Sequence, residues 1–500
     1  MRKIPTGMAT QHPDNAGKPY WHSRAFVSTA AELKECFLCF SDLGIDEYNW
    51  DWEGKYVDEA VVDRLLHQHL EYFQKHPLGR DKFLTFRIPN PRVEKQFRLA
   101  RAFMVMITSS QLSQSLGFDD PPIFETILPL TESAQEIIDI QEAFQHLVSL
   151  EHKLLKMRES MKSIEIIPLF EQVAKIVESP EILKRYIVLH RNVFRKIPAY
   201  IRPYCARSDP ALNSGLVPTI VSLKIALWEY RKLERQTGVK LYPMVGTGSL
   251  PFRGGISPSS IETGVEEYRG VATLTLQSAF RYDYEKTQVR DAVEFLKKYL
   301  PGKTPISIHD SQKKAVIKSI PFFEKYYQQS IEKLAPIINS LSTQLARRRE
   351  RMQHIGLFGY SRGFGGIILP RAIPFTAALY SIGIPPELIG TGRGIREAKR
   401  QGIWTEILPL YVNFRSDMIK AGYFLNKENV TSLANVFGGW EEVLEDIEEV
   451  EKEIGEELGP RKGTHFEHYA LSGRIFKALE EKKKMSNLLS YGGMLRKSLG

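Results

Sequence analysis

The stretch that decides the fold reads Cys205-Ala206-Arg207-Ser208-Asp209-Pro210-Ala211-Leu212-Asn213-Ser214-Gly215. An apolar run, Ala199-Tyr200-Ile201, leads into it, and charged, hydroxyl and turn-forming residues follow. This order predicts a buried strand that ends in a loop. The same order occurs 38 positions before Asp209, where residues 164–170 end at Glu171, and 38 positions after it, where residues 239–245 end at Gly246-Thr247-Gly248. A βαβ unit needs roughly 30 or more residues, so each interval fits one strand, one loop and one helix.

Eight candidate strands can be placed in this way along residues 1–284. Their polar ends lie near positions 12, 50, 87, 125, 171, 209, 247 and 277, and helical patterns such as residues 57–73 and 134–155 separate them. Eight such cycles predict an α/β fold of the (β/α)8 barrel type, which carries its site at the carboxyl ends of the strands. A doubly wound sheet is the alternative, but it would more often carry a phosphate-binding glycine loop after its first strand.

Residues 285–500 are expected to form a large, mainly helical portion packed on the barrel. Helical patterns cover residues 287–299, 317–351 and 440–458. The basic run at residues 347–351 falls in the second of these and is predicted to be a solvated helix face. A glycine-rich interruption at residues 359–366 is different in kind, and we expect it to form a loop that folds over the site.

The composition indicates a soluble globular enzyme, with 43% hydrophobic and 25% charged residues. No apolar run reaches the ~18 residues of a membrane span and no signal peptide is recognisable, so we expect a cytoplasmic protein with no membrane contact. The net charge of +9 would suit nucleic acid or a small polyanion. Because the basic residues are scattered and form no basic–aromatic stripe, we expect no nucleic acid partner and favour an anionic substrate.

Two carboxylates, Glu171 and Asp209, stand at the ends of adjacent predicted strands. Mg²⁺ typically takes one or two carboxylates and completes its shell with water and substrate oxygens, so the pair predicts a site for a hard divalent cation. Capping or salt-bridged carboxylates explain the spacing equally well. Glu125 is a rival ligand, because Pro122-Ile123-Phe124-Glu125 has the same form as Pro168-Leu169-Phe170-Glu171.

The glycine-rich loop and one histidine are further candidates. The loop at residues 246–255 would present backbone N–H groups beside the Arg253 guanidinium, a combination suited to phosphate. A simple turn explains its glycines as well. His12, which Pro13 follows, could act as a general acid or base because the unperturbed pKa of histidine lies near neutrality. A lone histidine is nevertheless more often structural.

The motifs of this chain, taken in order, resemble those of the archaeal-type phosphoenolpyruvate carboxylase family. The family's T-x-H-P is similar to residues 10–13, its P-L-F-E to residues 168–171 and its S-D-S-x-K-D-x-G to residues 208–215. The family's G-R-G-G-x-x-G-R-G-G loop is similar to residues 246–255, and its T-E-Q is similar to residues 275–277. Later in the chain, its S-R is similar to residues 361–362, its L-R-A-I-P to residues 369–374 and, loosely, its C-terminal G-M-R-N-T-G to residues 493–500. The resemblance therefore covers nearly the whole chain.

This resemblance implies a reaction in which phosphoenolpyruvate and bicarbonate become oxaloacetate and inorganic phosphate, with Mg²⁺ or Mn²⁺ as cofactor and a homotetramer as the assembly. It also implies roles for individual residues. The metal ligands would be Glu171 and Asp209. The catalytic residues would be His12, Arg253, Arg362 and Arg371, and the substrate-binding residues would be Arg87, Gly246, Thr247, Gly248 and Gln277.

The chain departs from the family pattern at three positions. Leu212 replaces the lysine after the metal aspartate, Thr247 replaces the first arginine of the glycine loop, and Val245 stands where the longer bacterial and plant form has a histidine. Two other classes of function stay open at this point. Another metal-dependent barrel lyase of the phosphoenolpyruvate/pyruvate group would not need bicarbonate, and a basic RNA-binding protein would bind RNA in a salt-dependent way without turnover.

Overall fold

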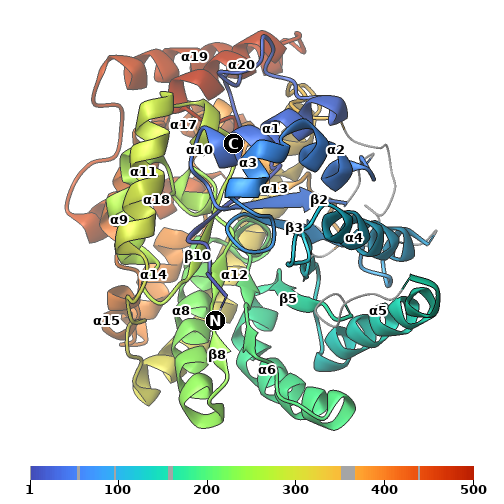
Figure 1. Ribbon diagram of the computed structural model, residues 1–500. Coiled ribbons are helices and arrows are strands. Elements are labelled where there is room, and N and C mark those ends of the chain that lie inside the picture. Colours follow the sequence, from blue (N-terminus) through green and yellow to red (C-terminus); the bar gives the residue numbers. More distant parts are fainter. Residues whose placement is uncertain (1, 53–56, 95–96, 156–161, 351–365, 437–439) are drawn as a thin grey trace.

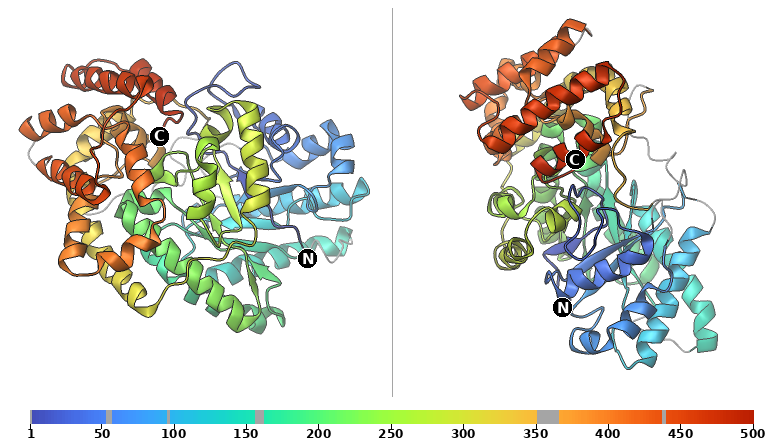
Figure 2. Two further views of the ribbon diagram at one scale, coloured as in Figure 1. Left: turned by 90° about the vertical axis from the view of Figure 1, so that its left-hand side faces the viewer. Right: turned by 90° about the horizontal axis from the view of Figure 1, so that it is seen from above.

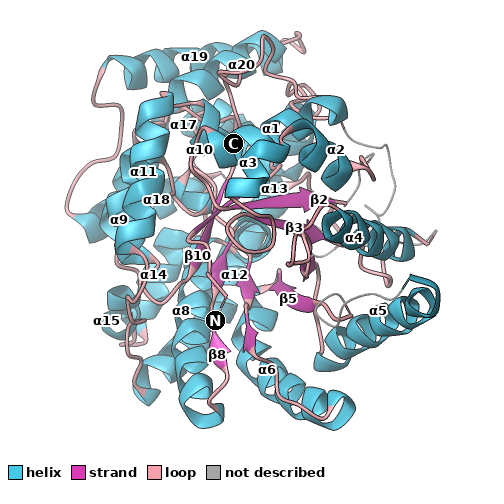
Figure 3. Ribbon diagram, in the orientation of Figure 1, coloured by secondary structure: helices cyan, strands magenta, loops and turns pink. Residues whose placement is uncertain are grey.

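The structure is a computed structural model that describes residues 2–500 apart from 53–56, 95–96, 156–161, 351–365 and 437–439. Its centre is a closed barrel of eight parallel strands surrounded by helices (Figures 1 and 3). This confirms the predicted (β/α)8 barrel. Around the barrel the strands follow the order β1 (Gly7–Ala9), β10 (Thr273–Leu276), β9 (Met244–Val245), β7 (Tyr204–Cys205), β5 (Glu165–Phe170), β4 (Glu125–Leu128), β3 (Phe83–Arg87) and β2 (Glu47–Asp51).

Two barrel strands are short because a proline interrupts each of them. Pro203 separates β7 from β6 (Tyr200–Ile201), and Pro243 separates β9 from β8 (Lys240–Leu241). Proline has no N–H group to donate to a neighbouring strand, so at each proline the segment leaves one sheet and enters another. β6 and β8 pair with each other outside the barrel. The strand predicted to begin at residue 199 therefore enters the barrel only at Tyr204.

The predicted end of the fourth strand at Glu125 is wrong, because β4 begins there. Glu125 pairs in register with Glu165, the first residue of β5, and thus lies at the amino end of the barrel. Its side chain is held inside the barrel by Arg202, whose Nη1 donates to Glu125 Oε2 at 2.6 Å. Arg202 also donates to both carboxylate oxygens of Glu47 and to the Thr273 hydroxyl. We refer to Arg202, Glu47, Glu125 and Thr273 as the barrel floor.

Helices surround the barrel and connect its strands along the chain. Those before residue 300 are α1 (Thr29–Ser41), α2 (Val61–Gln68), α3 (Leu70–Lys75), α4 (Arg98–Ser115), α5 (Ala134–Leu155), α6 (Val173–Phe194), α7 (Ser208–Ser214), α8 (Leu216–Thr237), α9 (Ile261–Glu267), α10 (Ser278–Tyr282) and α11 (Lys286–Tyr299), with the 3-10 turns η2 (Pro251–Arg253) and η3 (Pro258–Ser260). The barrel interior is filled by the apolar side chains of Met8, Ile127, Ile167, Leu169, Tyr204 and Met244.

The remaining chain forms the helical portion, which lies against one flank of the barrel (yellow to red in Figure 2). It consists of α12 (Asp310–Ser342), α13 (Ala372–Ser381), α14 (Thr391–Arg400), α15 (Trp404–Ile407), η5 (Leu408–Leu410), α16 (Phe414–Gly422), α17 (Lys427–Val436), α18 (Glu441–Ile454), α19 (Gly463–Glu480) and α20 (Ser486–Arg496). One apolar cluster joins α7 and α8 to α12 and later helices. The apolar cluster of the barrel includes residues as far along the chain as Leu300, which follows α11. Core packing therefore continues past the predicted boundary at residue 284. Within the described ranges, no helix is both long and apolar enough to cross a membrane.

The arginine run at residues 347–351 is not a solvated helix face, as far as its described residues 347–350 show. α12 ends at Ser342, and Arg348 and Arg349 are buried. Arg348 Nε donates to the backbone oxygen of Asn15 at 2.9 Å, and Arg349 makes two hydrogen bonds to the carboxylate of Glu35. These buried carboxylate and carbonyl partners come from the barrel part, which explains why a local charge pattern could not predict them.

Candidate active site

The carboxyl ends of the barrel strands bring most of the predicted site residues to one rim. His12 follows β1, Arg87 ends β3, Glu171 follows β5, and Gln277 follows β10. Asp209 lies in the first turn of α7, directly after β7. Parallel strands place their carboxyl ends at the same edge, and this edge is where barrel enzymes build their sites.

The Arg253 guanidinium lies at the point where four segments of the chain meet. It is 1% exposed. Nη1 donates to Asp14 Oδ2 at 3.2 Å and to an oxygen of Gly500, Nη2 donates to Gln277 Oε1, and Nε donates to Ser208 Oγ at 3.2 Å. Burial lowers the pKa of Arg253, and the charges of Asp14 and Asp209 act in the opposite direction. A buried guanidinium with planar donors is suited to bind phosphate or carboxylate groups.

The glycine loop packs so closely around Arg253 that a side chain at either of two glycines would crowd its neighbours. A Cβ at Gly248 would lie 3.0 Å from the Arg253 Cζ. Gly254 has φ +127°, and a Cβ there would lie 3.0 Å from the Thr247 Cα. The loop is anchored on β10, because the Thr247 N–H donates to Thr275 Oγ1 at 2.7 Å and its hydroxyl donates to the Thr275 carbonyl at 2.8 Å. Both donors of Thr247 are therefore used to fix the loop, and its role in substrate binding stays a prediction.

Glu171 and Asp209 lie on neighbouring loops of the rim. Their strands are paired, with Phe170 opposite Cys205. Glu171 is 8% exposed, and its Oε2 accepts a hydrogen bond from the Leu130 N–H at 2.8 Å. Carboxylate oxygens are ligands that Mg²⁺ prefers, so this pair stays the predicted metal site. Among the described residues, no group of three or more His, Cys, Asp and Glu side chains gathers as a metal site.

His12 lies on the loop after β1. Its Nδ1 is 2.9 Å from the Thr10 hydroxyl oxygen, and its carbonyl accepts from the Asp14 N–H at 3.1 Å. The loop that carries His12 also carries Asp14, and thereby connects the histidine to Arg253 through two residues of backbone.

The other predicted arginines of the described residues have contacts of their own. Arg87 forms a bidentate pair with Asp51, with distances of 2.9 Å from Nε to Oδ1 and 2.6 Å from Nη2 to Oδ2. Arg371 immediately precedes α13, and its carbonyl accepts from the Phe375 N–H at 2.9 Å. Arg362, with residues 359–365 of the predicted covering loop, lies outside the described residues.

The chain is similar to known proteins over nearly its whole length. The family model described as phosphoenolpyruvate carboxylase matches residues 4–500. Proteins named phosphoenolpyruvate carboxylase are similar to the chain: that of Leuconostoc mesenteroides is 38% identical over 95% of this chain and 94% of its own length, and that of Metallosphaera sedula is 37% identical over 100% of both. That of Pyrococcus abyssi is 39% identical over 91% of this chain and 94% of its own length. The chain belongs to the phosphoenolpyruvate carboxylase family.

Sequence reasoning missed two acidic residues at this phosphoenolpyruvate carboxylase rim. Asp14 is fully buried; it accepts from Arg253 and, through Oδ1, from the Ala279 N–H at 2.7 Å. Asp51 holds Arg87. The position of Asp14, two residues after His12, was the available signal, since a buried acid beside a predicted catalytic histidine needs a partner.

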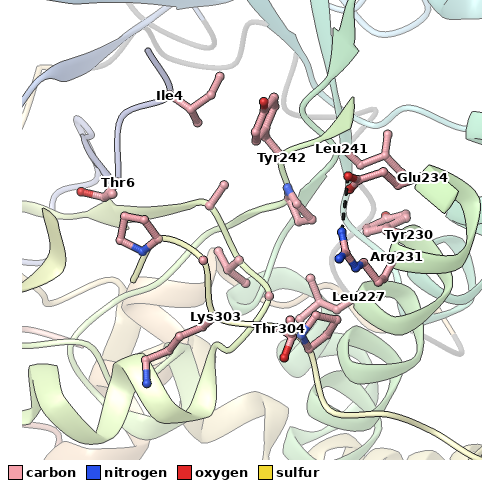
Figure 4. A pocket seen from close by; sticks show the side chains of 17 residues that line it. Ile4, Thr6, Leu227, Tyr230, Arg231, Glu234, Leu241, Tyr242, Lys303 and Thr304 are labelled. Atoms are coloured by element: carbon pink, nitrogen blue, oxygen red, sulfur yellow. Dashed lines mark hydrogen bonds and ion pairs between the residues drawn. The ribbon is translucent and has the colours of Figure 1, made fainter. Parts of the chain in front are cut away.

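A cavity of about 340 Å³ lies at the other end of this carboxylase barrel (Figure 4). It is lined by residues that precede strands, such as Thr6 and Ala272, and by Tyr230 and Arg231 of α8. Arg231 Nη1 is paired with Glu234 Oε1 at 3.4 Å. The cavity is lined by none of the predicted site residues.

Proposed function

We propose that the carboxyl rim around Arg253 is the place where this phosphoenolpyruvate carboxylase turns over its substrates. As a member of the family, the protein converts phosphoenolpyruvate and bicarbonate into oxaloacetate and inorganic phosphate. The observation that carries the proposal is the buried Arg253 guanidinium, to which the loops after β1, β7 and β10 each contribute an oxygen acceptor. A cation preorganised in this way is suited to a transferring phosphoryl group.

In the proposed division of roles, Arg253 neutralises the phosphoryl group as it leaves phosphoenolpyruvate and forms carboxyphosphate with bicarbonate. Its Asp14, Ser208 and Gln277 contacts fix the plane of the guanidinium before substrate arrives. Arg87 is oriented by its bidentate bond to Asp51 and would bind substrate oxygens from the β3 side. Arg371 and Arg362 are further candidates for anion binding.

Glu171 and Asp209 are the residues that would hold Mg²⁺ or Mn²⁺. Both are carboxylates that follow paired strands, and the Leu130 N–H donates to one oxygen of Glu171. The cation, when bound, would supply positive charge that stabilises the enolate. The nearness of Asp209 to Arg253 is supported by the effect of its charge, which raises the Arg253 pKa.

His12 is proposed to take the proton of carboxyphosphate, which then separates into CO₂ and phosphate beside the enolate. The Thr10 contact holds the ring through Nδ1, so Nε2 would accept the proton. The enolate then attacks CO₂ to form oxaloacetate. Water must be excluded, since protonation of the enolate gives pyruvate instead. The buried contact between Gly500 and Arg253 supports a role for the final residues in this exclusion.

The metal identity and a homotetrameric assembly belong to the same proposal and rest on the family resemblance. A cytoplasmic location is also proposed, and it rests on the sequence, in which no membrane span and no signal peptide was recognised. One coupled assay tests the reaction. Oxaloacetate should form only when phosphoenolpyruvate, bicarbonate and Mg²⁺ or Mn²⁺ are all present. Turnover of phosphoenolpyruvate that is unchanged by the omission of bicarbonate would instead support another barrel lyase of the phosphoenolpyruvate/pyruvate group.

A further inference from the structure

Glu387 is a buried carboxylate of the helical portion, located between α13 and α14. It is 0% exposed. Its Oε1 accepts one hydrogen bond from the backbone N–H of Phe252 at 2.7 Å and another from the Tyr380 hydroxyl at 2.7 Å. Phe252 is the residue before Arg253 in the 3-10 turn η2. The carboxylate thus contacts the glycine loop one residue from its guanidinium, across 135 positions of sequence.

The glycine loop is held from two sides at this turn. On the barrel side, the Tyr268 hydroxyl donates to the Gly254 carbonyl at 2.8 Å. On the side of the helical portion, the Phe252 ring stacks against Phe375 with ring centroids 5.8 Å apart. Glu387 supplies the hydrogen bond on that second side. The first N–H groups of a helical turn have no partner within the turn, so an outside acceptor is needed where water is excluded.

Glu387 is not explained by an ion pair. Within the part of the chain that the structure describes, no cationic side chain forms a salt bridge with it, and its Oε2 has no hydrogen-bond partner. Burial raises the pKa of Glu387 to about 7, against the opposing effect of the Tyr380 and Phe252 hydrogen bonds, and the charge of Asp417 raises it further. The charge of Glu387 in turn raises the pKa of Tyr327 and of Tyr380. A buried carboxylate without a cation is costly, and its clearest contact with the site is the Phe252 N–H.

We propose that Glu387 is a positioning residue, which sets the place of Arg253 by accepting the hydrogen bond of the Phe252 backbone. The inference rests on the proposed role of Arg253 in phosphoryl binding. It makes the helical portion part of the active-site machinery through a second route besides its arginines. What matters in this role is an acceptor oxygen at the correct reach and not the charge of the side chain.

Two substitutions separate reach from charge. Glu387→Asp keeps the carboxyl group but shortens the side chain by about 1.5 Å, so the oxygen should withdraw from the Phe252 N–H. Glu387→Gln removes the charge but keeps an acceptor oxygen at full reach. Because a misplacement of about 1 Å can cost up to about 10²-fold, we expect Glu387→Asp to lower kcat/KM by about 10- to 100-fold with a higher KM for phosphoenolpyruvate. Glu387→Gln should stay close to the parent in both.

The matched control is Asp417→Asn. Asp417 is also a buried carboxylate of the helical portion with a pKa raised to about 7, and a Cβ at Gly255 would lie 3.8 Å from its Oδ1. Within the described residues it accepts from Tyr411 and makes no hydrogen bond to the glycine loop. The KM for phosphoenolpyruvate should therefore not change. KM does not depend on the fraction of folded enzyme, so a general loss of stability cannot imitate the expected result.

A second readout is amide hydrogen exchange of the peptide that contains Phe252, which should become faster in Glu387→Asp and not in Glu387→Gln. A parental KM and parental exchange in Glu387→Asp would overturn the proposal. If that variant is insoluble, a large rise in KM in Glu387→Gln would overturn it as well. Arg253→Lys is measured in parallel: a parental KM there would remove the proposed role of Arg253, whereas an impaired Arg253→Lys with a parental Glu387→Asp would reject Glu387 alone.

Discussion

Asp417 on α16 is a buried carboxylate whose ionisation should lower the stability of this protein as the pH rises. Its side chain is 7% exposed, and Oδ2 accepts from the Tyr411 hydroxyl at 2.8 Å. Burial, and then the charge of Glu267, raise the pKa of Asp417 from 3.8 to about 7, while Lys420, Tyr411 and Arg207 act in the opposite direction. The folded state therefore binds this proton more tightly than the unfolded state does.

The sign and size of the effect follow from this shift. A raised folded-state pKa contributes stability that is fully present below the unfolded pKa of about 4 and is lost as the pH rises to about 7. Asp417→Asn cannot ionise, so its stability relative to the parent should grow over this window. Between pH 5 and pH 8.5 the window covers about two pKa units at about 1.4 kcal/mol each, or about 3 kcal/mol in all. With an unfolding entropy of about 2.1 cal/mol/K per residue, this corresponds to about 3 °C in Tm for 500 residues.

The assay is differential scanning calorimetry of parent and Asp417→Asn at pH 5 and pH 8.5, at one scan rate. The quantity of interest is the change in the Tm difference between the two pH values, because any pH-independent effect of the substitution cancels. We expect the variant to gain about 3 °C relative to the parent on going to pH 8.5. An equal Tm difference at both pH values would refute the reasoning, since it would mean that Asp417 ionises alike in the folded and unfolded protein.

Four further predictions concern the barrel. Asp209→Asn should abolish activity at ordinary Mg²⁺ while the Tm is retained, and residual activity close to the parent would remove it from the metal site. Arg253→Lys should lose most turnover despite its charge, because an ammonium cannot reproduce the guanidinium fork; near-normal kcat would contradict this. His12→Asn should still release phosphate in a bicarbonate-dependent way, but it should form ~10²–10⁴-fold less oxaloacetate, with pyruvate in its place. An unchanged ratio of oxaloacetate to phosphate would exclude the assigned role. Glu125→Gln should cost about 3 kcal/mol of stability, since it breaks a buried pair with Arg202, yet leave kcat of the folded enzyme intact, and the reverse pattern would place Glu125 in the chemistry.

The barrel could be predicted from the sequence because strand–loop–helix cycles repeat at nearly constant intervals. Where local pattern and tertiary contacts disagree, the prediction fails. At Glu125 an apolar run ends at a charge, as it does at Glu171, but the chain is only beginning its strand there. Arg202, together with Arg2, supplies the positive charge that makes this carboxylate tolerable inside the barrel. That partner lies 77 residues away, and no local reading of the sequence can find it.

The meeting of the candidate residues at one rim was predictable from residue types and strand ends, and their hydrogen-bond partners were less so. The loop around Arg253 could be recognised by its glycines, whereas the acceptors of the guanidinium come from Asp14, Gln277 and Gly500, which are 239, 24 and 247 residues away. Such distant contacts form only when the barrel closes and the helical portion docks. The Glu387 contact with Phe252 belongs to the same class.

The barrel floor has a consequence for how the chain can be divided. Arg202 joins acceptors that lie 155, 77 and 71 residues from it, on β2, β4 and β10. A fragment that stops before β10 would therefore contain this arginine and its carboxylates but lack the strand that closes the barrel. Water would then reach charges that are buried in the complete barrel. Half-barrels of this protein should consequently be poor folding units, and two separately expressed halves should acquire their structure only by association. All hydrogen bonds of the barrel floor can therefore form only when the complete set of strands has closed into the barrel.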